Sequence, residues 1–244
     1  MGKVLAVAYG VVCYVIFFAT FLYAIGFVDG LVVPKDVDTG AAGPLIPTLV
    51  INGALLAIFA VQHSVMARPG FKAWWTKIVP ASVERSTYVL LASLALILMF
   101  WQWRPLPATV WSVTGPAATA LWVLNAIGWA VLLTSTFLIS HFDLFGLNQV
   151  WAYATGKPAP AKPFHTPLFY RYVRHPLYLG FMIGFWAAPT MSQGHLLFAI
   201  GATGYILVGI FFEERDLVAA FGDTYRGYQK RVSMLLPWIP KAGA

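Results

Sequence analysis

Long apolar stretches alternate with short polar segments over the whole chain. Five such stretches occupy residues 4–27, 45–66, 87–103, 117–139 and 177–212. A helix needs about 20 apolar residues to cross the hydrocarbon core of a bilayer, so each of the first four stretches predicts one membrane span. The pattern predicts an all-α integral membrane protein.

The last stretch is too long for a single crossing. Proline and glycine in the segment 189–194 mark a turn within it. We therefore predict a C-terminal helical hairpin with arms at 177–189 and 195–212, followed by a tail at 213–244. The first arm is shorter than a full span, so it crosses tilted or only enters the bilayer. The chain then has five transmembrane helices without this arm, or six with it, in one domain over residues 1–244.

Composition agrees with this prediction. The chain is 59% hydrophobic and 10% charged, whereas soluble domains average about 45–50% and about 25%. A soluble globular protein and a nucleic-acid binder are excluded, although the net charge is +7. The single cysteine, Cys13, excludes a disulfide framework and a cysteine-based zinc site, and we expect no metal.

Placement explains the positive charge. Of the 16 lysines and arginines, only Lys35 and Arg104 fall on one side of the membrane when the spans alternate. The side that carries the others is cytoplasmic by the positive-inside rule, and it holds both termini.

Titratable residues collect at the ends of several spans on that same cytoplasmic side. Each position alone would also fit a solvated helix end or an interfacial histidine, so their common location is what indicates a site. Adjacent glutamates point about 100° apart on a helix, so one can face the bundle while the other pairs with an arginine. The collected residues are His63, Glu84, Arg85, His141, Asp143, Arg174, His175, Glu213, Glu214, Arg215 and Asp216, and Tyr225 and Tyr228 follow them.

Two C-terminal motifs carry a resemblance to known enzymes. Residues 174–180 read Arg-His-Pro-Leu-Tyr-Leu-Gly, and a Glu-Glu pair and spaced tyrosines follow. The combination resembles the isoprenylcysteine carboxyl methyltransferase and phospholipid methyltransferase superfamily of integral-membrane enzymes. The resemblance implies an S-adenosylmethionine site at the cytosolic face. The residues that match its motifs are Arg174, His175, Tyr178, Gly180, Glu213, Glu214 and Tyr225.

Further segments resemble a narrower group, the bacterial methanethiol S-methyltransferases. They are residues 59–69, 84–90, 136–147 and 170–176, and NnrU-type membrane proteins share part of this pattern. The resemblance implies transfer of a methyl group from S-adenosylmethionine to methanethiol, giving dimethyl sulfide, and also to hydrogen sulfide. It further implies a place in the bacterial inner (plasma) membrane.

A thiol acceptor must be deprotonated, because the thiolate is the nucleophile. His141 and Asp143 have the spacing of a base and an orienting carboxylate, so we expect this pair to activate the thiol, with His63 as the second candidate. Arg85 or Tyr88 would lower the pKa of the thiol or close the pocket.

Two alternatives stay open at this point. The same fold could methylate a prenylcysteine or a phospholipid, or the chain could be a non-enzymatic NnrU-like protein that handles haem or transports a solute. The expected partners are a small thiol and the lipid bilayer, without nucleic acid, and the oligomeric state stays open.

Overall fold

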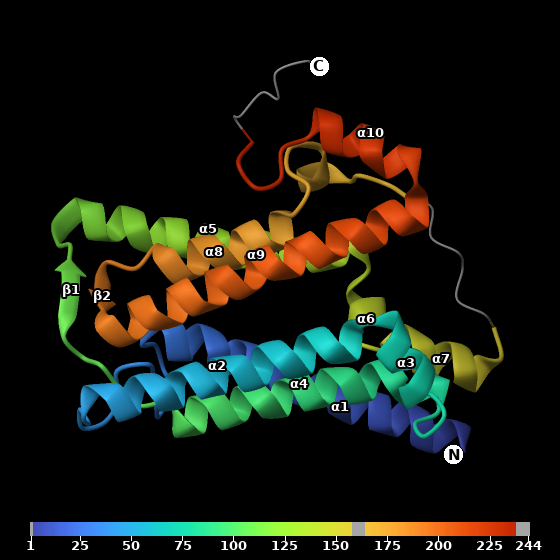
Figure 1. The fold of residues 1–244 in the computed structure, drawn as a ribbon, viewed down its shortest axis with the longest axis horizontal. Helices are drawn as coiled ribbons and strands as arrows, with labels where there is room; N and C mark the ends of the chain where they lie inside the picture. Colours follow the sequence, from blue (N-terminus) through green and yellow to red (C-terminus); the bar gives the residue numbers. More distant parts are fainter. Residues whose placement is uncertain (1, 158–163, 238–244) are drawn as a thin grey trace. The chain divides into compact units, whose positions relative to one another are not determined.

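The computed structural model describes residues 2–157 and 164–237, which are mostly helical (Figure 1). Among these residues, five helices are long and apolar enough to cross a membrane. They confirm the prediction of an all-α integral membrane protein. The five are α1 (Lys3–Asp29), α2 (Leu45–Ala67), α4 (Ala81–Gln102), α5 (Gly115–Ile139) and α9 (Gln193–Phe221).

Shorter elements join the long helices. The strands β1 (Thr109–Ser112) and β2 (Thr190–Ser192) pair as a two-stranded sheet. The short helices are α3 (Pro69–Trp75), α6 (His141–Leu144), α7 (Leu147–Thr155), the 3-10 turn η1 (Leu168–Arg171), α8 (Pro176–Trp186) and α10 (Asp223–Arg231).

The chain forms two compact units, which are described one at a time. The described part of the first unit comprises residues up to 110, 141–157 and 191–198. The second comprises residues 111–140, 164–190 and 199–237. That residues 1–244 act as one methyltransferase domain stays a prediction, and 238–244 of the expected tail lie outside the described residues.

In the first unit, α1 packs on α4 and α7, and α4 also packs on α2. Two glycines allow α7 to approach α1 and α4 closely. A Cβ atom on Gly10 of α1 would lie 2.7 Å from Val150 Cγ2, and one on Gly146 would lie 2.5 Å from Ser86 Oγ. Gly146 also has a φ angle of +90°, which L side chains rarely adopt. The preceding helix α6, which carries His141 and Asp143, is thereby held against this bundle.

Helix α4 begins at Ala81, earlier than the apolar limit at residue 87. Pro80 precedes the first turn, and Glu84 places a negative charge at the positive end of the helix dipole. Arg85 and Tyr88 therefore lie within a regular helix, one turn apart. The hydrophobic pattern missed this turn because its charged residues interrupt the apolar run.

In the second unit, α5 and α8 pack with their backbones almost in contact. A Cβ atom on Gly180 would lie 2.6 Å from the carbonyl oxygen of Gly128, and one on Gly184 would lie 2.8 Å from the Trp129 ring. Asn125 of α5 adds a hydrogen bond from Nδ2 to the carbonyl oxygen of Gly184, at 2.9 Å. Small residues at a helix crossing allow such an approach in membrane proteins. The structure therefore gives Gly180 a packing role.

The predicted hairpin has unequal arms. Helix α8 is 11 residues long, whereas α9 is 29 residues long and continues past the apolar limit at 212 to Phe221. The two arms are joined by a hydrogen bond from Trp186 Nε1 to Thr203 Oγ1, at 2.9 Å. Glu213 and Glu214 consequently lie inside a helix and not in a tail.

Candidate active site

The residues predicted for the two halves of the chemistry fall in different units. Those expected to activate the thiol all belong to the first unit, and those expected to bind the cofactor all belong to the second. The residues expected to activate the thiol are His63, Arg85, Tyr88, His141 and Asp143. The residues expected to bind the cofactor, here called the cofactor group, are Arg174, His175, Tyr178, Gly180, Glu213, Glu214 and Tyr225.

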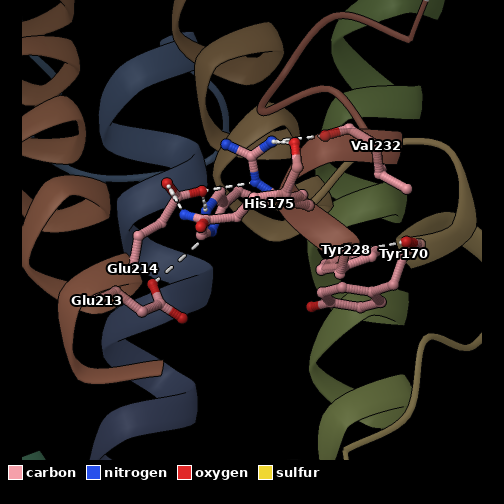
Figure 2. Close-up of polar contacts among 8 residues, drawn as sticks. Tyr170, His175, Glu213, Glu214, Tyr228 and Val232 are labelled. Atoms are coloured by element: carbon pink, nitrogen blue, oxygen red, sulfur yellow. Dashed lines mark hydrogen bonds and ion pairs between the residues drawn. The ribbon is translucent and has the colours of Figure 1, made fainter. Parts of the chain in front are cut away.

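An ion pair between Arg174 and Glu214 lies at the centre of the cofactor group (Figure 2). Arg174 Nε donates to Glu214 Oε1 at 2.6 Å, and the Arg174 side chain is only 5% exposed. Its Nη1 atom donates to the backbone carbonyl oxygens of Val232 at 2.5 Å and Gln229 at 3.3 Å. The guanidinium thus ties the segment before α8 to the end of α9 and to the chain around α10.

Glu214 accepts hydrogen bonds from two further side chains. His175 Nε2 lies 3.0 Å from Oε1, and Gln229 Nε2 donates to Oε2 at 2.9 Å. The backbone N–H groups of Arg174 and His175 also donate to the carbonyl oxygens of Ser233 and Met234, at 2.9 and 3.1 Å. Both carboxylate oxygens of Glu214 are therefore engaged by protein groups. Its role in this geometry is to hold Arg174 and His175 in place.

Glu213 is in a different situation. Its Oε2 atom is buried and has no hydrogen-bond partner among residues 2–157 and 164–237, and it lies 3.9 Å from His175 Nδ1. The Glu213 side chain as a whole is 41% exposed, against 17% for Glu214. The two adjacent glutamates do diverge as their helical spacing predicts. Glu214 pairs with the arginine, and Glu213 keeps an acceptor available.

Three aromatic rings form a cluster beside these carboxylates. Phe164 lies 5.8 Å from Tyr225 and 5.3 Å from Tyr228, measured between ring centroids. Burial raises the pKa of Tyr228 to about 12 and raises the pKa of Tyr225 still further, so both phenols are protonated at neutral pH. The Tyr225 side chain is 1% exposed, and its hydroxyl has no hydrogen-bond partner in the described part of the chain.

Two predicted cofactor residues lie on α8. The ring of Tyr178 is 5.7 Å from the ring of His175, so this tyrosine borders the Glu214 network. Gly180 is buried against α5, as described above. A direct role of Tyr178 or Gly180 in cofactor binding stays a prediction.

In the first unit, His141 is buried among aromatic side chains. Tyr14 of α1 places its hydroxyl 2.8 Å from His141 Nε2, and the Phe145 ring lies 4.8 Å from the His141 ring. Burial lowers the pKa of His141, which favours the neutral imidazole. Asp143 accepts hydrogen bonds through its backbone carbonyl from Gly146 and Gln149. The expectation that the Asp143 carboxylate orients His141 stays a prediction.

The other predicted residues of this unit form a cluster. The His63 ring lies 5.0 Å from the Tyr88 ring, and the Arg85 guanidinium carbon lies 4.8 Å from the centre of that ring. Tyr88 donates to the backbone carbonyl oxygen of His63 at 3.3 Å, and Arg85 Nε donates to that of Leu144 at 2.7 Å. His63, Arg85 and Tyr88 are thus brought together from α2 and α4.

Comparison with known proteins decides the family. A sequence model of the NnrU protein family matches residues 53–232. The chain belongs to this family. A methanethiol S-methyltransferase of Mycobacterium tuberculosis is 59% identical over 98% of this chain and 98% of that protein. Methanethiol S-methyltransferase 1 of Bradyrhizobium diazoefficiens is 57% identical over 97% of this chain and 83% of that protein.

A more distant relative is Nurim of Mus musculus, which is 28% identical over 71% of this chain and 69% of that protein. No solved structure matches the chain.

Several residues of this NnrU-family chain contribute to the geometry without having been singled out from the sequence. Tyr228 belongs to the spaced tyrosines of the sequence motif, and its place one helical turn after Tyr225 puts it on the same face, but the motif gives it no role of its own. Gln229 and Tyr14 carry no comparable signal, since their partners are distant in sequence. Tyr14 also lies before the segment that the family model matches.

Proposed function

We propose that this NnrU-family protein methylates methanethiol to dimethyl sulfide, with S-adenosylmethionine as the methyl donor, and that it also accepts hydrogen sulfide. The observation that carries the proposal is the 59% identity, over 98% of both chains, to a protein named methanethiol S-methyltransferase. That alignment is long enough to include both groups of predicted site residues.

The polar groups of the second unit fit S-adenosylmethionine. Glu213 offers a buried carboxylate oxygen and Tyr225 a buried hydroxyl, and neither has a hydrogen-bond partner among the described residues. A buried polar group without a partner costs folding free energy, so a ligand that supplies partners is expected. The ammonium and ribose hydroxyls of S-adenosylmethionine are such partners, and we place Tyr225 near the adenosine.

The roles proposed for the neighbouring residues follow from their bonds. Glu214 and Arg174 hold the segment in shape, while His175 and Tyr178 line the site. S-adenosylmethionine supplies an electrophilic methyl group when it is bound. Positioning of donor and acceptor provides much of the rate in such a displacement, so this network acts by fixing geometry.

On the acceptor side, methanethiol must give up its proton before its sulfur can attack. The sulfur–carbon bond forms as the bond from the methyl carbon to the sulfonium breaks, and the electron pair of the broken bond remains on the donor. We propose neutral His141, whose Nε2 lies 2.8 Å from the Tyr14 hydroxyl, as the base. Asp143 is proposed to orient it, with His63 as the second candidate for the base and with Arg85 and Tyr88 favouring the thiolate.

We further propose that both termini and the site lie on the cytoplasmic side of the bacterial inner membrane. The distribution of lysine and arginine supports this orientation. In a Cys13→Ala background, a cysteine replacing the exposed Lys77 should react with a membrane-impermeant maleimide only after cell lysis. A cysteine replacing the exposed Ala42 should react in intact cells. The reverse labelling would contradict the orientation.

An acceptor competition assay tests the function itself. Purified protein in detergent is given S-adenosylmethionine with methanethiol, sodium sulfide, a farnesylated cysteine or phosphatidylethanolamine, and S-adenosylhomocysteine release is measured. We expect release with methanethiol and sulfide, from the wild type and from a Tyr172→Phe control at an exposed tyrosine. Release with the lipid acceptors alone would favour the larger-acceptor alternative. A Soret band without any release would favour haem handling.

A further inference from the structure

Tyr170 lies in a turn that contains exposed residues such as Leu168, but its own hydroxyl is buried. It lies in η1, where its N–H donates to the carbonyl oxygen of Pro167 at 3.0 Å. Its own carbonyl oxygen accepts a hydrogen bond from the Tyr228 hydroxyl (Figure 2). Leu168, two residues earlier, has a φ of +41°, a conformation that is costly for a branched residue. The backbone at Tyr170 is therefore fixed by specific bonds despite local strain.

The hydroxyl of Tyr170 is buried, and within residues 2–157 and 164–237 no group hydrogen-bonds to it. Burial, followed by the negative charge of Glu213, raises the pKa of Tyr170, so the phenol stays protonated and remains a hydrogen-bond donor. An unsatisfied donor that is held rigidly in a buried position indicates a ligand that accepts from it.

Glu213 supplies the opposite property at the same place. Its Oε2 atom is likewise buried and without a hydrogen-bond partner in the described part of the chain. Both residues belong to the group of polar side chains drawn in Figure 2, and the charge of Glu213 adds to the raised pKa of Tyr170. The neighbouring Glu214 is already saturated by Arg174, His175 and Gln229, so the charge of Glu213 is the one left for a ligand.

A buried donor and a buried charged acceptor, both without a hydrogen-bond partner among the described residues, match an α-amino acid group. The ammonium and carboxylate of such a group are attached to one carbon, so a receptor for it needs an acceptor and a donor side by side. We propose that Tyr170 and Glu213 bind the amino-acid end of the methyl donor, with the Tyr170 hydroxyl donating to its carboxylate and Glu213 accepting from its ammonium. This assignment rests on the proposed function, because it takes S-adenosylmethionine as the donor.

The assignment divides the donor between two groups of residues. Phe164, Tyr225 and Tyr228 form the aromatic cluster, which suits the flat adenine and its ribose. Tyr170 and Glu213 recognise the part of the molecule that a nucleoside thioether lacks. The protein would then discriminate S-adenosylhomocysteine from 5′-methylthioadenosine, which differ in this amino-acid end.

Calorimetric binding of these two ligands to the purified full-length protein tests the inference. Tyr170→Phe removes one hydroxyl, and Glu213→Gln removes one charge while keeping the side-chain size. Each should weaken S-adenosylhomocysteine binding about 10-fold or more, as expected for loss of a hydrogen bond to a charged group. Neither should change 5′-methylthioadenosine binding. Tyr172→Phe, at a tyrosine that is 66% exposed, should change neither affinity.

The possible results separate the inference from the proposed function. Unchanged binding of S-adenosylhomocysteine to Tyr170→Phe would overturn the inference alone. An equal loss of affinity for both ligands would also overturn it, because Tyr170 would then contact the nucleoside or support the fold. A wild-type protein that binds neither ligand would refute S-adenosylmethionine as the donor, and the inference would fall with it. Thermal unfolding of each variant identifies loss of the fold.

Discussion

Replacing Glu214 by glutamine should destabilise the second unit far more than the same change at Glu213. Glu214 carries the charge that compensates Arg174, whose side chain is 5% exposed and lies 2.6 Å from Oε1. Breaking a buried pair by removing one partner typically costs about 3–5 kcal/mol, because the other charge is left uncompensated. Glutamine keeps one acceptor oxygen, so we expect a loss of about 3 kcal/mol in the free energy of unfolding.

Glu213→Gln is the matched control. The Glu213 side chain is 41% exposed, and the ion pair that involves it is a 3.9 Å contact with His175. Exposed pairs contribute about 0–1 kcal/mol, so this variant should unfold close to the wild type while binding S-adenosylhomocysteine more weakly. The two adjacent substitutions are thus expected to separate stability from binding.

Unfolding by titration with sodium dodecyl sulfate in mixed micelles, followed by tryptophan fluorescence, measures both variants. A double-mutant cycle with Arg174→Met gives the coupling between the two charges. The double variant should be more stable than Glu214→Gln alone, because the uncompensated guanidinium is gone. A Glu214→Gln protein as stable as Glu213→Gln would refute this description of the network.

Further predictions concern helix packing and the proposed base. Gly180→Ala should lower stability by about 1–3 kcal/mol through overpacking against α5, whereas Gly209→Ala, with open space around it, should not, as measured by the same titration. Tyr14→Phe should lower the methylation rate about 10-fold, since it removes one hydrogen bond to His141; an unchanged rate in steady-state assays would exclude this role. The lowered pKa of His141 predicts that stability falls as pH drops below its ordinary value of 6.5, because only the unfolded chain then takes up the proton. His141→Asn should make the free energy of unfolding less dependent on pH between about 5 and 7, the range around the ordinary histidine pKa.

Apolar patterning predicted the existence of the long helices but not all of their ends. The run of apolar residues marks the part of a helix that lies in hydrocarbon, whereas the hydrogen-bonded helix continues into polar sequence. The N-terminal turn of α4, with Glu84 and Arg85, and the last turns of α9 were missed for this reason.

At the site, local geometry was predictable and distant pairing was not. The divergence of Glu213 and Glu214 follows from helical spacing, and the structure shows it. Which of the two pairs with Arg174 depends on contacts across 40 positions of sequence, and no local pattern contains that information. The same holds for Tyr14 and His141, which are 127 positions apart. The Gly180-x-x-x-Gly184 spacing is typical of a close helix contact, but no local pattern identifies the partner, which is α5 at Gly128.

The central claim is transfer of the donor's methyl group to methanethiol. Purified protein should be given S-adenosylmethionine carrying a trideuterated methyl group together with unlabelled methanethiol, and the headspace analysed by mass spectrometry. We predict dimethyl sulfide with one trideuterated and one ordinary methyl group, formed in equal amount to S-adenosylhomocysteine. Absence of this product from protein that binds S-adenosylhomocysteine, or a label found only in lipid, would contradict the account.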